Sequence, residues 1–367
     1  MATGEMDDTW ARRVWQREGI FCYVLWLAVL PLSLLYGIGV RIHNLLYALG
    51  WRSVESLPRT VVSVGNLTVG GTGKTPTTVW LAGELGKHGY RVAILSRGYK
   101  GAGESSVILA PASGAPLSLG DHLAFSAAGD EPVMMSQIFR QRVGAGKERR
   151  EVGSRMLREA EVDVFILDDG FQHRRLKRDI DLLLLGSDWS GWLLPAGPFR
   201  EPRSSLSRAS FYLVTGAREN WEAVLSPRPR EKIFFGSLQP RALLTLEGGN
   251  WKEYPLTLLD RSKVLAVSAI ADPAPFYRMI HDWEGEIVDT VEFPDHHDYS
   301  ARDWQRINRA AHDVDFILTT EKDIIKLARF PFAKEKLLAL RVEMAVEHGD
   351  LLVRAVEVAI QARRSES

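Results

Sequence analysis

Hydrophobic positions from about residue 59 onwards come in short runs, separated by polar and glycine-rich segments. Between the first two runs, Val79, Ala82 and Leu85 recur at helical spacing, and Gly89 marks a plausible helix end. A strand, loop, helix and strand in this order predict a parallel sheet with a right-handed crossover. The runs that we predict to be buried strands are residues 60–64, 91–96, 162–167, 182–185 and 211–214.

The pattern changes after about residue 225. Pro227 and Pro229 are each followed by an arginine, which predicts a linker. Residues 233–246 and 251–256 are separated by Gly-Gly-Asn at 248–250 and predict a hairpin-like excursion. A second alternating section follows, with expected strands at 263–268 and 315–320 and a helix at 351–362.

These patterns predict an α/β fold with two domains, which also suits a length of 367 residues. We expect a parallel-sheet domain at 51–228, a β linker at 229–260 and a smaller α/β domain at 261–367. The segment at 1–50 is expected to form an N-terminal apolar helix that associates with a membrane.

An uncharged, apolar run near the N-terminus covers residues 20–40. About 20 such residues are enough to span a bilayer, although Pro31 and Gly37 weaken a straight span. A late start and no clear small-residue cleavage site argue against a signal peptide. Arginines flank the run on both sides, so its orientation is open. We favour a helix lying in one leaflet over a true span and over a buried soluble helix.

Charge and cysteine content narrow the function classes. Lys+Arg and Asp+Glu both number 46, and this balance gives no general reason to expect nucleic-acid binding. Cys22 is the only cysteine, so neither an internal disulfide nor a cysteine-based metal site is expected.

The segment 65–76 reads GNLTVGGTGKTP and lies between a predicted strand and a predicted helix. Glycines let the backbone wrap closely around phosphates, and the helix N-terminus attracts anions. Lys74 is expected to bridge outer phosphate oxygens, and the Thr75 hydroxyl to bind magnesium. Thr68 departs from the usual pattern, which has glycine there. The predicted nucleotide-binding residues are Thr68, Val69, Gly70, Gly71, Thr72, Gly73, Lys74 and Thr75. The first domain is therefore expected to be of the P-loop NTPase type.

Acidic residues follow at two further places. Asp168 and Asp169 end a predicted strand, where side chains face the ligand crevice of an open α/β sheet. Since magnesium prefers oxygen ligands, both are predicted to bind the metal. Asp130 and Glu131 precede Pro132, so the pair either starts a helix or supplies a metal ligand and a general base.

Several separated segments together resemble one family, the tetraacyldisaccharide 4'-kinases, which are the lipid A 4'-kinases of Gram-negative bacteria. Thr68 belongs to this family's own version of the phosphate loop. The matching segments are residues 63–76, 95–101, 129–132, 167–185, 193–202, 293–299 and 319–323, in the family's order.

The resemblance implies transfer of the γ-phosphate of ATP, with Mg²⁺, to the 4'-hydroxyl of a tetraacyldisaccharide 1-phosphate. The product is the lipid IVA-type precursor of lipid A. It further implies a monomer at the cytoplasmic face of the bacterial inner membrane, with a glycolipid substrate and no nucleic-acid partner.

Site roles follow from the same resemblance. Lys74 and Asp130 are expected to be catalytic, with Asp130 as the base and His296 as its partner, although His297 is adjacent. Glu131 and Gln172 are implied as ligands of the metal or its waters, beside Thr75, Asp168 and Asp169. Because His296 comes from the second section of the chain, the site is predicted to assemble between two domains.

Basic clusters at 174–178 and 200–203 leave two interpretations open: contact with substrate phosphates or a solvated charged face. The seven basic residues of 140–158 predict an exposed helix.

A rival hypothesis is a P-loop GTPase or metallochaperone-type switch. The nearest guanine-reading motif is 320–323, where Glu321 replaces the usual asparagine. A membrane-anchored binding protein without catalysis leaves Asp130 and the 168–173 segment unexplained.

Overall fold

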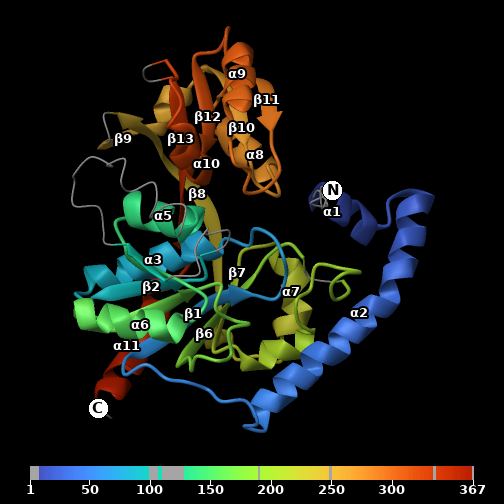
Figure 1. Cartoon of the computed structure of the whole chain (residues 1–367), viewed down its shortest axis with the longest axis vertical. Helices are drawn as coiled ribbons and strands as arrows, with labels where there is room; N and C mark the ends of the chain where they lie inside the picture. The colour runs from blue at the N-terminus through green and yellow to red at the C-terminus, as the bar shows by residue number, and fades with distance from the viewer. Residues whose placement is uncertain are drawn as a thin grey trace. The chain divides into compact units, whose positions relative to one another are not determined.

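The computed structural model describes residues 8–98, 106–109, 128–188, 191–247, 250–333 and 336–365 (Figure 1). The chain forms two compact units. Unit 1 comprises Met1–Arg97, Gly144–Ser237 and Met344–Ser367, and unit 2 comprises Gly98–Val143 and Leu238–Glu343. Each unit therefore uses separate stretches of chain, which differs from the contiguous ranges predicted above. The chain leaves unit 1 within strand β8 and returns to it within strand β13.

The sheet of unit 1 is parallel, with strands in the order β8-β7-β6-β1-β5-β2. Its strands are β1 (Thr60–Asn66), β2 (Val92–Ser96), β5 (Val164–Asp168), β6 (Ile180–Leu185), β7 (Phe211–Val214) and the start of β8 (Ile233–Glu247). Every residue of β1, β5 and β6 is buried, as is typical of parallel strands covered on both faces. The five strands predicted from the hydrophobic runs are confirmed.

Helix α3 (Lys74–Lys87) follows β1 and buries Leu81, Ala82 and Leu85. It ends just before Gly89, whose φ of 86° suits glycine. Unit 1 also contains the helices α6 (Arg149–Glu159), α7 (Arg218–Leu225) and α11 (Gly349–Ser365). Two short 3₁₀ turns are η1 (Arg203–Arg208) and η2 (Arg230–Lys232). Helix α11 confirms the predicted C-terminal helix, but it contacts β1 and α3 and so belongs to unit 1.

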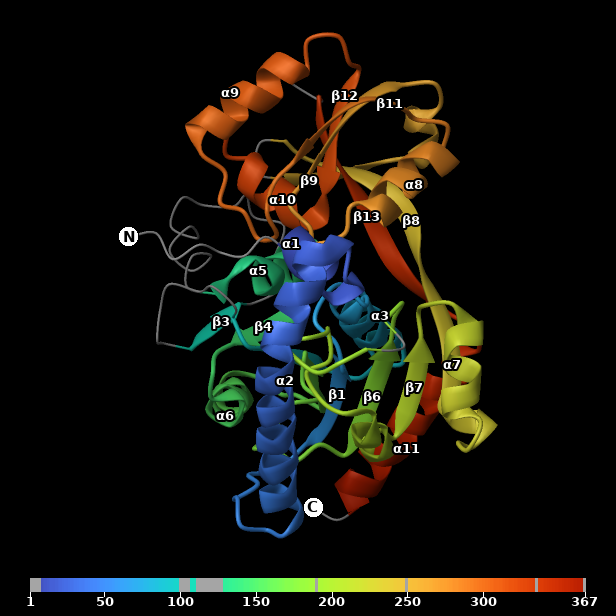
Figure 2. The same ribbon diagram turned by 90° about the vertical axis from the view of Figure 1, so that its right-hand side faces the viewer.

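The N-terminal run forms α2 (Gly19–Ala48), which is preceded by α1 (Asp8–Gln16). Figure 2 shows α2 as one long helix, and Pro31 does not interrupt it. By length and composition it is able to cross a membrane, and only 17% of its apolar window is buried inside the protein. Such exposure disfavours the buried soluble helix among the three placements considered above.

The strands of unit 2 follow the order β11-β10-β12-β13-β8. Its strands are β10 (Lys263–Ser268), β11 (Glu286–Glu292), β12 (Phe316–Thr320), β13 (Leu337–Val346) and the end of β8, with β9 (Asn250–Tyr254) antiparallel to β8. The predicted hairpin is confirmed, although Gly248 and Gly249 of its turn lie outside the described residues. The remaining elements are β3 (Val107–Leu109), β4 (Arg142–Ala145) at the boundary between the units, α5 (Asp130–Gln137), α8 (Ala274–Asp282), α9 (Ala301–Ala310), α10 (Glu321–Leu327) and the 3₁₀ turn η3 (Leu256–Leu259).

Candidate active site

The glycine-rich loop joins β1 to α3, as predicted. Gly70 has a φ of 105° and Gly73 a φ of 83°, values that strain any residue with a Cβ. Gly73 is the residue that caps α3, so Lys74 and Thr75 form the first turn of the helix. Backbone N–H groups at such a helix start form a binding site for phosphate anions.

Hydrogen bonds hold the loop from two sides. Asn66 Nδ2 donates to Thr72 Oγ1 at 2.9 Å, and Thr215 Oγ1 donates to the Thr72 carbonyl at 3.1 Å. On the other side, the Val69 N–H donates to the Pro198 carbonyl at 2.9 Å. These hydrogen bonds fix Val69 and Thr72, and so hold the backbone of residues 68–75, the predicted nucleotide-binding set, without a ligand.

The predicted acidic pair lies at the carboxyl end of β5, which neighbours β1 in register, with Val64 opposite Asp168. Thr78 Oγ1 donates to Asp168 Oδ1 at 3.1 Å. The Asp169 carboxylate is 3.9 Å from Lys74 Nζ and 2.9 Å from the Arg200 guanidinium. Burial raises the pKa of Asp169, but the charges of Lys74 and Arg200 outweigh it and lower that pKa overall. Asp169 is therefore held as an anion beside the P-loop lysine.

Gln172 lies against the end of β1, since its Nε2 donates to the Asn66 carbonyl at 2.9 Å and to Glu201 Oε1 at 3.2 Å. Gln172 Oε1 and Asn66 Oδ1 are buried, and neither accepts a hydrogen bond from the described residues. Two such oxygens suit a hard cation or its water ligands. Together with the Thr75 hydroxyl and the two aspartates, this donor set fits Mg²⁺.

Arg149 belongs to this site and was not predicted. It is 3% exposed, and its guanidinium donates to the carbonyls of Asp168 at 2.9 Å and Asp169 at 3.2 Å. Burial lowers its pKa to about 10, against the opposing charges of the two aspartates. The prediction of one exposed helix over 140–158 is wrong, because residues 142–145 form β4 and Arg149 turns inward. No local signal separates Arg149 from the six other basic residues of that segment.

Replacing Arg149 by leucine is expected to lower the free energy of unfolding by about 1–3 kcal/mol, because the two carbonyls lose a buried donor. Turnover is expected to fall as well, since the turn carrying both aspartates loses its support. Chemical denaturation and steady-state kinetics measure the two effects. Arg150, the exposed neighbour of Arg149, provides the control variant Arg150→Leu. Equal effects of Arg149→Leu and Arg150→Leu would contradict the role of Arg149 in supporting the turn.

Unit 2 contains the second predicted group of site residues. Asp130 is the first residue of α5, and His296 lies after β11. His296 Nδ1 is 3.6 Å from Asp130 Oδ2. Asp130 was predicted within the first domain, but Met134 and Ile138 pack α5 into the hydrophobic cluster of unit 2. The pair is therefore formed within one unit.

The structure separates the two adjacent histidines. His297 Nε2 is 3.1 Å from Asp303 Oδ2, and its ring stacks on Phe293 with centroids 4.7 Å apart. His296 instead faces Asp130 and has a φ of 58°. His296 is thus the partner of Asp130, which the sequence left open.

Two lysines of α10 contact the acidic pair of α5. Lys326 Nζ is 2.9 Å from Asp130 Oδ2, and Lys322 Nζ is 2.5 Å from Glu131 Oε1. Burial raises the pKa of Asp130, but hydrogen bonds to His296 and Lys326 and the lysine charge lower it to about 2. Asp130 is therefore ionised at any physiological pH. The role of Glu131 as a metal ligand stays a prediction.

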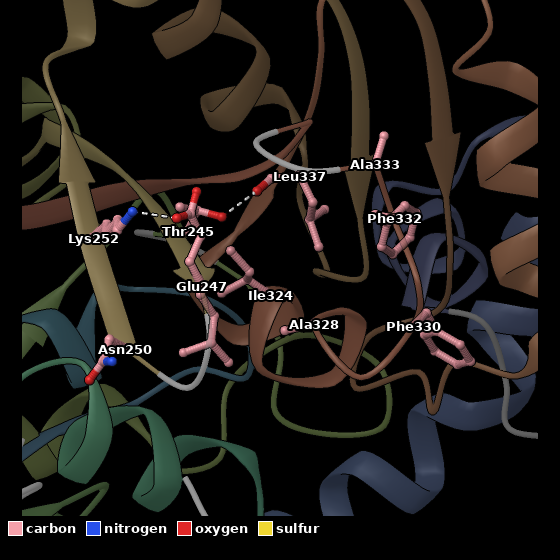
Figure 3. A pocket seen from close by; sticks show the side chains of 11 residues that line it. Thr245, Glu247, Asn250, Lys252, Ile324, Ala328, Phe330, Phe332, Ala333 and Leu337 are labelled. Carbon is pink, nitrogen blue, oxygen red and sulfur yellow. Dashed lines mark hydrogen bonds and ion pairs between the residues drawn. The ribbon is translucent and has the colours of Figure 1, made fainter. Parts of the chain in front are cut away.

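A cavity of about 550 Å³ lies on another side of α10, where Ile324 and Ala328 line it. Figure 3 shows Lys252 facing Glu247, with which it forms an ion pair, and the aromatic ring of Phe330 on the opposite side of the view. None of the predicted site residues lines this cavity.

The chain matches the tetraacyldisaccharide-1-P 4'-kinase family over residues 25–360. It belongs to this family. A tetraacyldisaccharide 4'-kinase of Syntrophus aciditrophicus is 39% identical, with 92% of this chain and 94% of the relative covered. The relative of the same name from Aquifex aeolicus is 33% identical over 90% of this chain and 97% of its own. The crystal structure of LpxK from Aquifex aeolicus in complex with ATP superposes with a TM-score of 0.75, at 32% identity, covering 92% of this chain and 99% of that one.

The family resemblance, the P-loop kinase fold and the kinase activity predicted from the sequence are confirmed. The chain is an ATP-dependent kinase that phosphorylates the 4'-position in lipid A biosynthesis, with ATP and Mg²⁺ as its cofactors. The hypotheses of a GTPase switch and of a binding protein without catalysis are thereby set aside.

Proposed function

We propose that two groups of residues divide the work of this kinase. The P-loop group of unit 1 holds the triphosphate, and the Asp130–His296 pair of unit 2 accepts the proton of the 4'-hydroxyl. The observation that carries this assignment is the pair itself, an ionised carboxylate with an imidazole 3.6 Å away.

In unit 1, Lys74 contacts the outer phosphates while the backbone of residues 68–75 surrounds them. Thr75, Asp168 and Asp169 would hold Mg²⁺, and Gln172 would contact the metal or one of its water ligands. When bound, the metal neutralises charge on the transferring phosphoryl group. Arg149 holds the Asp168 carbonyl and Arg200 holds the Asp169 carboxylate, and these contacts keep the two aspartates in place.

In unit 2, Asp130 accepts the proton as the sugar oxygen bonds to the γ-phosphorus. The O–H bond breaks, the bond from phosphorus to the bridging oxygen breaks, and ADP leaves with that electron pair. A carboxylate with a pKa of about 2 is a weak base. The proton therefore moves late in the transfer, when the forming O–P bond has acidified the hydroxyl, and His296 stabilises the charge of the carboxylate.

The activity is tested by following labelled γ-phosphate from ATP into the monophosphorylated disaccharide lipid in detergent. A labelled bis-phosphorylated lipid is expected, and chelation of Mg²⁺ should abolish it. ATP hydrolysis without lipid labelling would overturn the assignment. A lipid whose 4'-hydroxyl is already blocked is the control for the position of transfer.

The site of action is proposed to be the cytoplasmic face of the inner membrane, with a monomer bound to a glycolipid 1-phosphate. Its support is α2, which exposes large apolar side chains along much of its length. Leu27, Leu35 and Ile38 are 46%, 64% and 53% exposed. Burying them in lipid is favourable by roughly 1–2 kcal/mol each.

Replacing these three residues of α2 by glutamine is expected to lower binding to vesicles by at least about tenfold. The reason is the loss of apolar area, since the contacts of α2 within the protein stay intact. Co-sedimentation with phospholipid vesicles measures the effect. Val288 and Val358 are also exposed and serve as control sites. Unchanged sedimentation of the α2 variant would count against the membrane placement.

A further inference from the structure

Lys326 is a largely buried basic residue whose charge is used inside the protein. Its side chain is 11% exposed, although lysine is seldom buried without a partner. The ammonium has two partners: Asp130 Oδ2 at 2.9 Å and the His297 carbonyl at 2.7 Å. It also lies over the Tyr299 ring, 5.8 Å from the centroid. The ammonium thus links α5 to the loop that carries His296.

The helix that bears Lys326 is firmly placed. Ile324 and Leu327 of α10 are fully buried in the same hydrophobic cluster as Met134 and Ile138 of α5. At the start of α10, the Asp323 carboxylate accepts hydrogen bonds from Thr320 Oγ1 at 2.7 Å and the Ala269 N–H at 3.0 Å. Lys326 therefore projects from a rigid element, which suits a residue that positions another.

Two contacts of Asp130 converge on one oxygen. His296 Nδ1 and Lys326 Nζ both approach Oδ2. Among the described residues, no hydrogen bond or ion pair involves the other oxygen, Oδ1. A carboxylate pinned through one oxygen presents the second in a defined direction.

The loop after β11 depends on the same ammonium. His296 adopts a left-handed φ of 58°, which is uncommon for a residue with a Cβ. Lys326 holds the carbonyl of the next residue, His297. One cation thus fixes both the orientation of the Asp130 carboxylate and the backbone that presents the His296 ring.

We propose that Lys326 is a positioning residue of the kinase, which orients Asp130 so that Oδ1 faces the 4'-hydroxyl and keeps His296 beside it. This inference rests on the proposed role of Asp130 as the proton acceptor. An ordinary surface ion pair would contribute little to stability and would leave turnover unchanged.

The test compares Lys326→Met, Lys326→Arg and Arg329→Met in the lipid phosphorylation assay. Lys326→Met is expected to lower kcat about 10- to 100-fold, with both KM values changed less than about threefold, because displacement of a catalytic group acts on the chemical step. Lys326→Arg is expected to recover part of the loss. Arg329 bonds the Tyr299 carbonyl of the same loop without contacting Asp130, so Arg329→Met should keep kcat.

Wild-type kcat in Lys326→Met would overturn the proposal. An equal loss of kcat in Lys326→Met and Arg329→Met would also overturn it, because it would show that Lys326 acts only by anchoring the loop. If Lys326→Met does not fold, Lys326→Arg decides, because a merely structural cation would be fully replaced by arginine. Asp130→Asn distinguishes a failure of the proposed role of Asp130 as the base from a failure of the inference about Lys326. If it is fully active, the proposed base fails and the inference falls with it. If it is impaired while Lys326→Met is normal, only the inference fails.

Discussion

Replacing Asp130 by asparagine is expected to lower kcat by about 10²- to 10⁴-fold, which is the usual contribution of a positioned general base. Asparagine keeps the size of the side chain and its start-of-helix position, but it cannot accept the hydroxyl proton. Affinity for ATP is expected to stay within about threefold, because the residues proposed to hold the phosphates lie in unit 1. Lipid phosphorylation at saturating Mg-ATP and equilibrium binding of ATP measure the two quantities.

The matched control is Asp298→Asn. Asp298 lies two residues from His296 and is 83% exposed, where it pairs with Arg329. Its replacement removes a carboxylate from the same loop region without touching the acidic pair. Full activity of Asp130→Asn would require another base, and an equal loss in Asp298→Asn would point to a general effect of charge.

Replacing Lys74 by methionine is expected to have the second largest effect, a fall in kcat/KM for ATP of at least about 10²- to 10³-fold. Lys74 lies in the first turn of α3, 3.9 Å from Asp169, and is proposed to meet developing charge on the outer phosphates. The fold should persist, because Arg200 still neutralises Asp169 at 2.9 Å. Kinetics against ATP concentration and a thermal melt check both statements.

Lys87→Met serves as the control for this variant. Lys87 ends the same helix, is 71% exposed and pairs with Glu84. Its replacement removes the same charge from α3 at a distance from the phosphate loop, so its kinetics should match the wild type. A Lys74→Met enzyme with normal kcat/KM would show that the loop backbone and the metal are sufficient to stabilise the charge on the phosphates.

The strands and the phosphate loop were accessible from the sequence because their signals are local. Buried parallel strands appear as aliphatic runs, and β1, β5 and β6 are buried at every position. Gly70 and Gly73 are needed by the backbone angles of the loop itself. No local sequence signal indicates the lipid substrate, and its prediction came from the family resemblance.

Errors arose wherever distant segments meet. The domain ranges assumed a contiguous chain, whereas β8 and β13 each pass from one unit to the other. Arg149 was assigned to solvent because its neighbours are charged, yet it binds carbonyls about twenty residues away. The cavity beside α10 combines hairpin and helix residues that no sequence pattern connects.

The sequence by itself determined the strands of the first sheet, the phosphate loop, the acidic strand end and the family, because each is encoded in neighbouring residues or in several ordered motifs. Only the tertiary structure decided that His296 rather than His297 faces Asp130, that Asp130 belongs to unit 2, and that Lys326 holds its carboxylate. The physical reason is that ion pairs and burial depend on packing between α5, α10 and the loop after β11. These elements are far apart in the chain, and the backbone angle of His296 is set only when they pack.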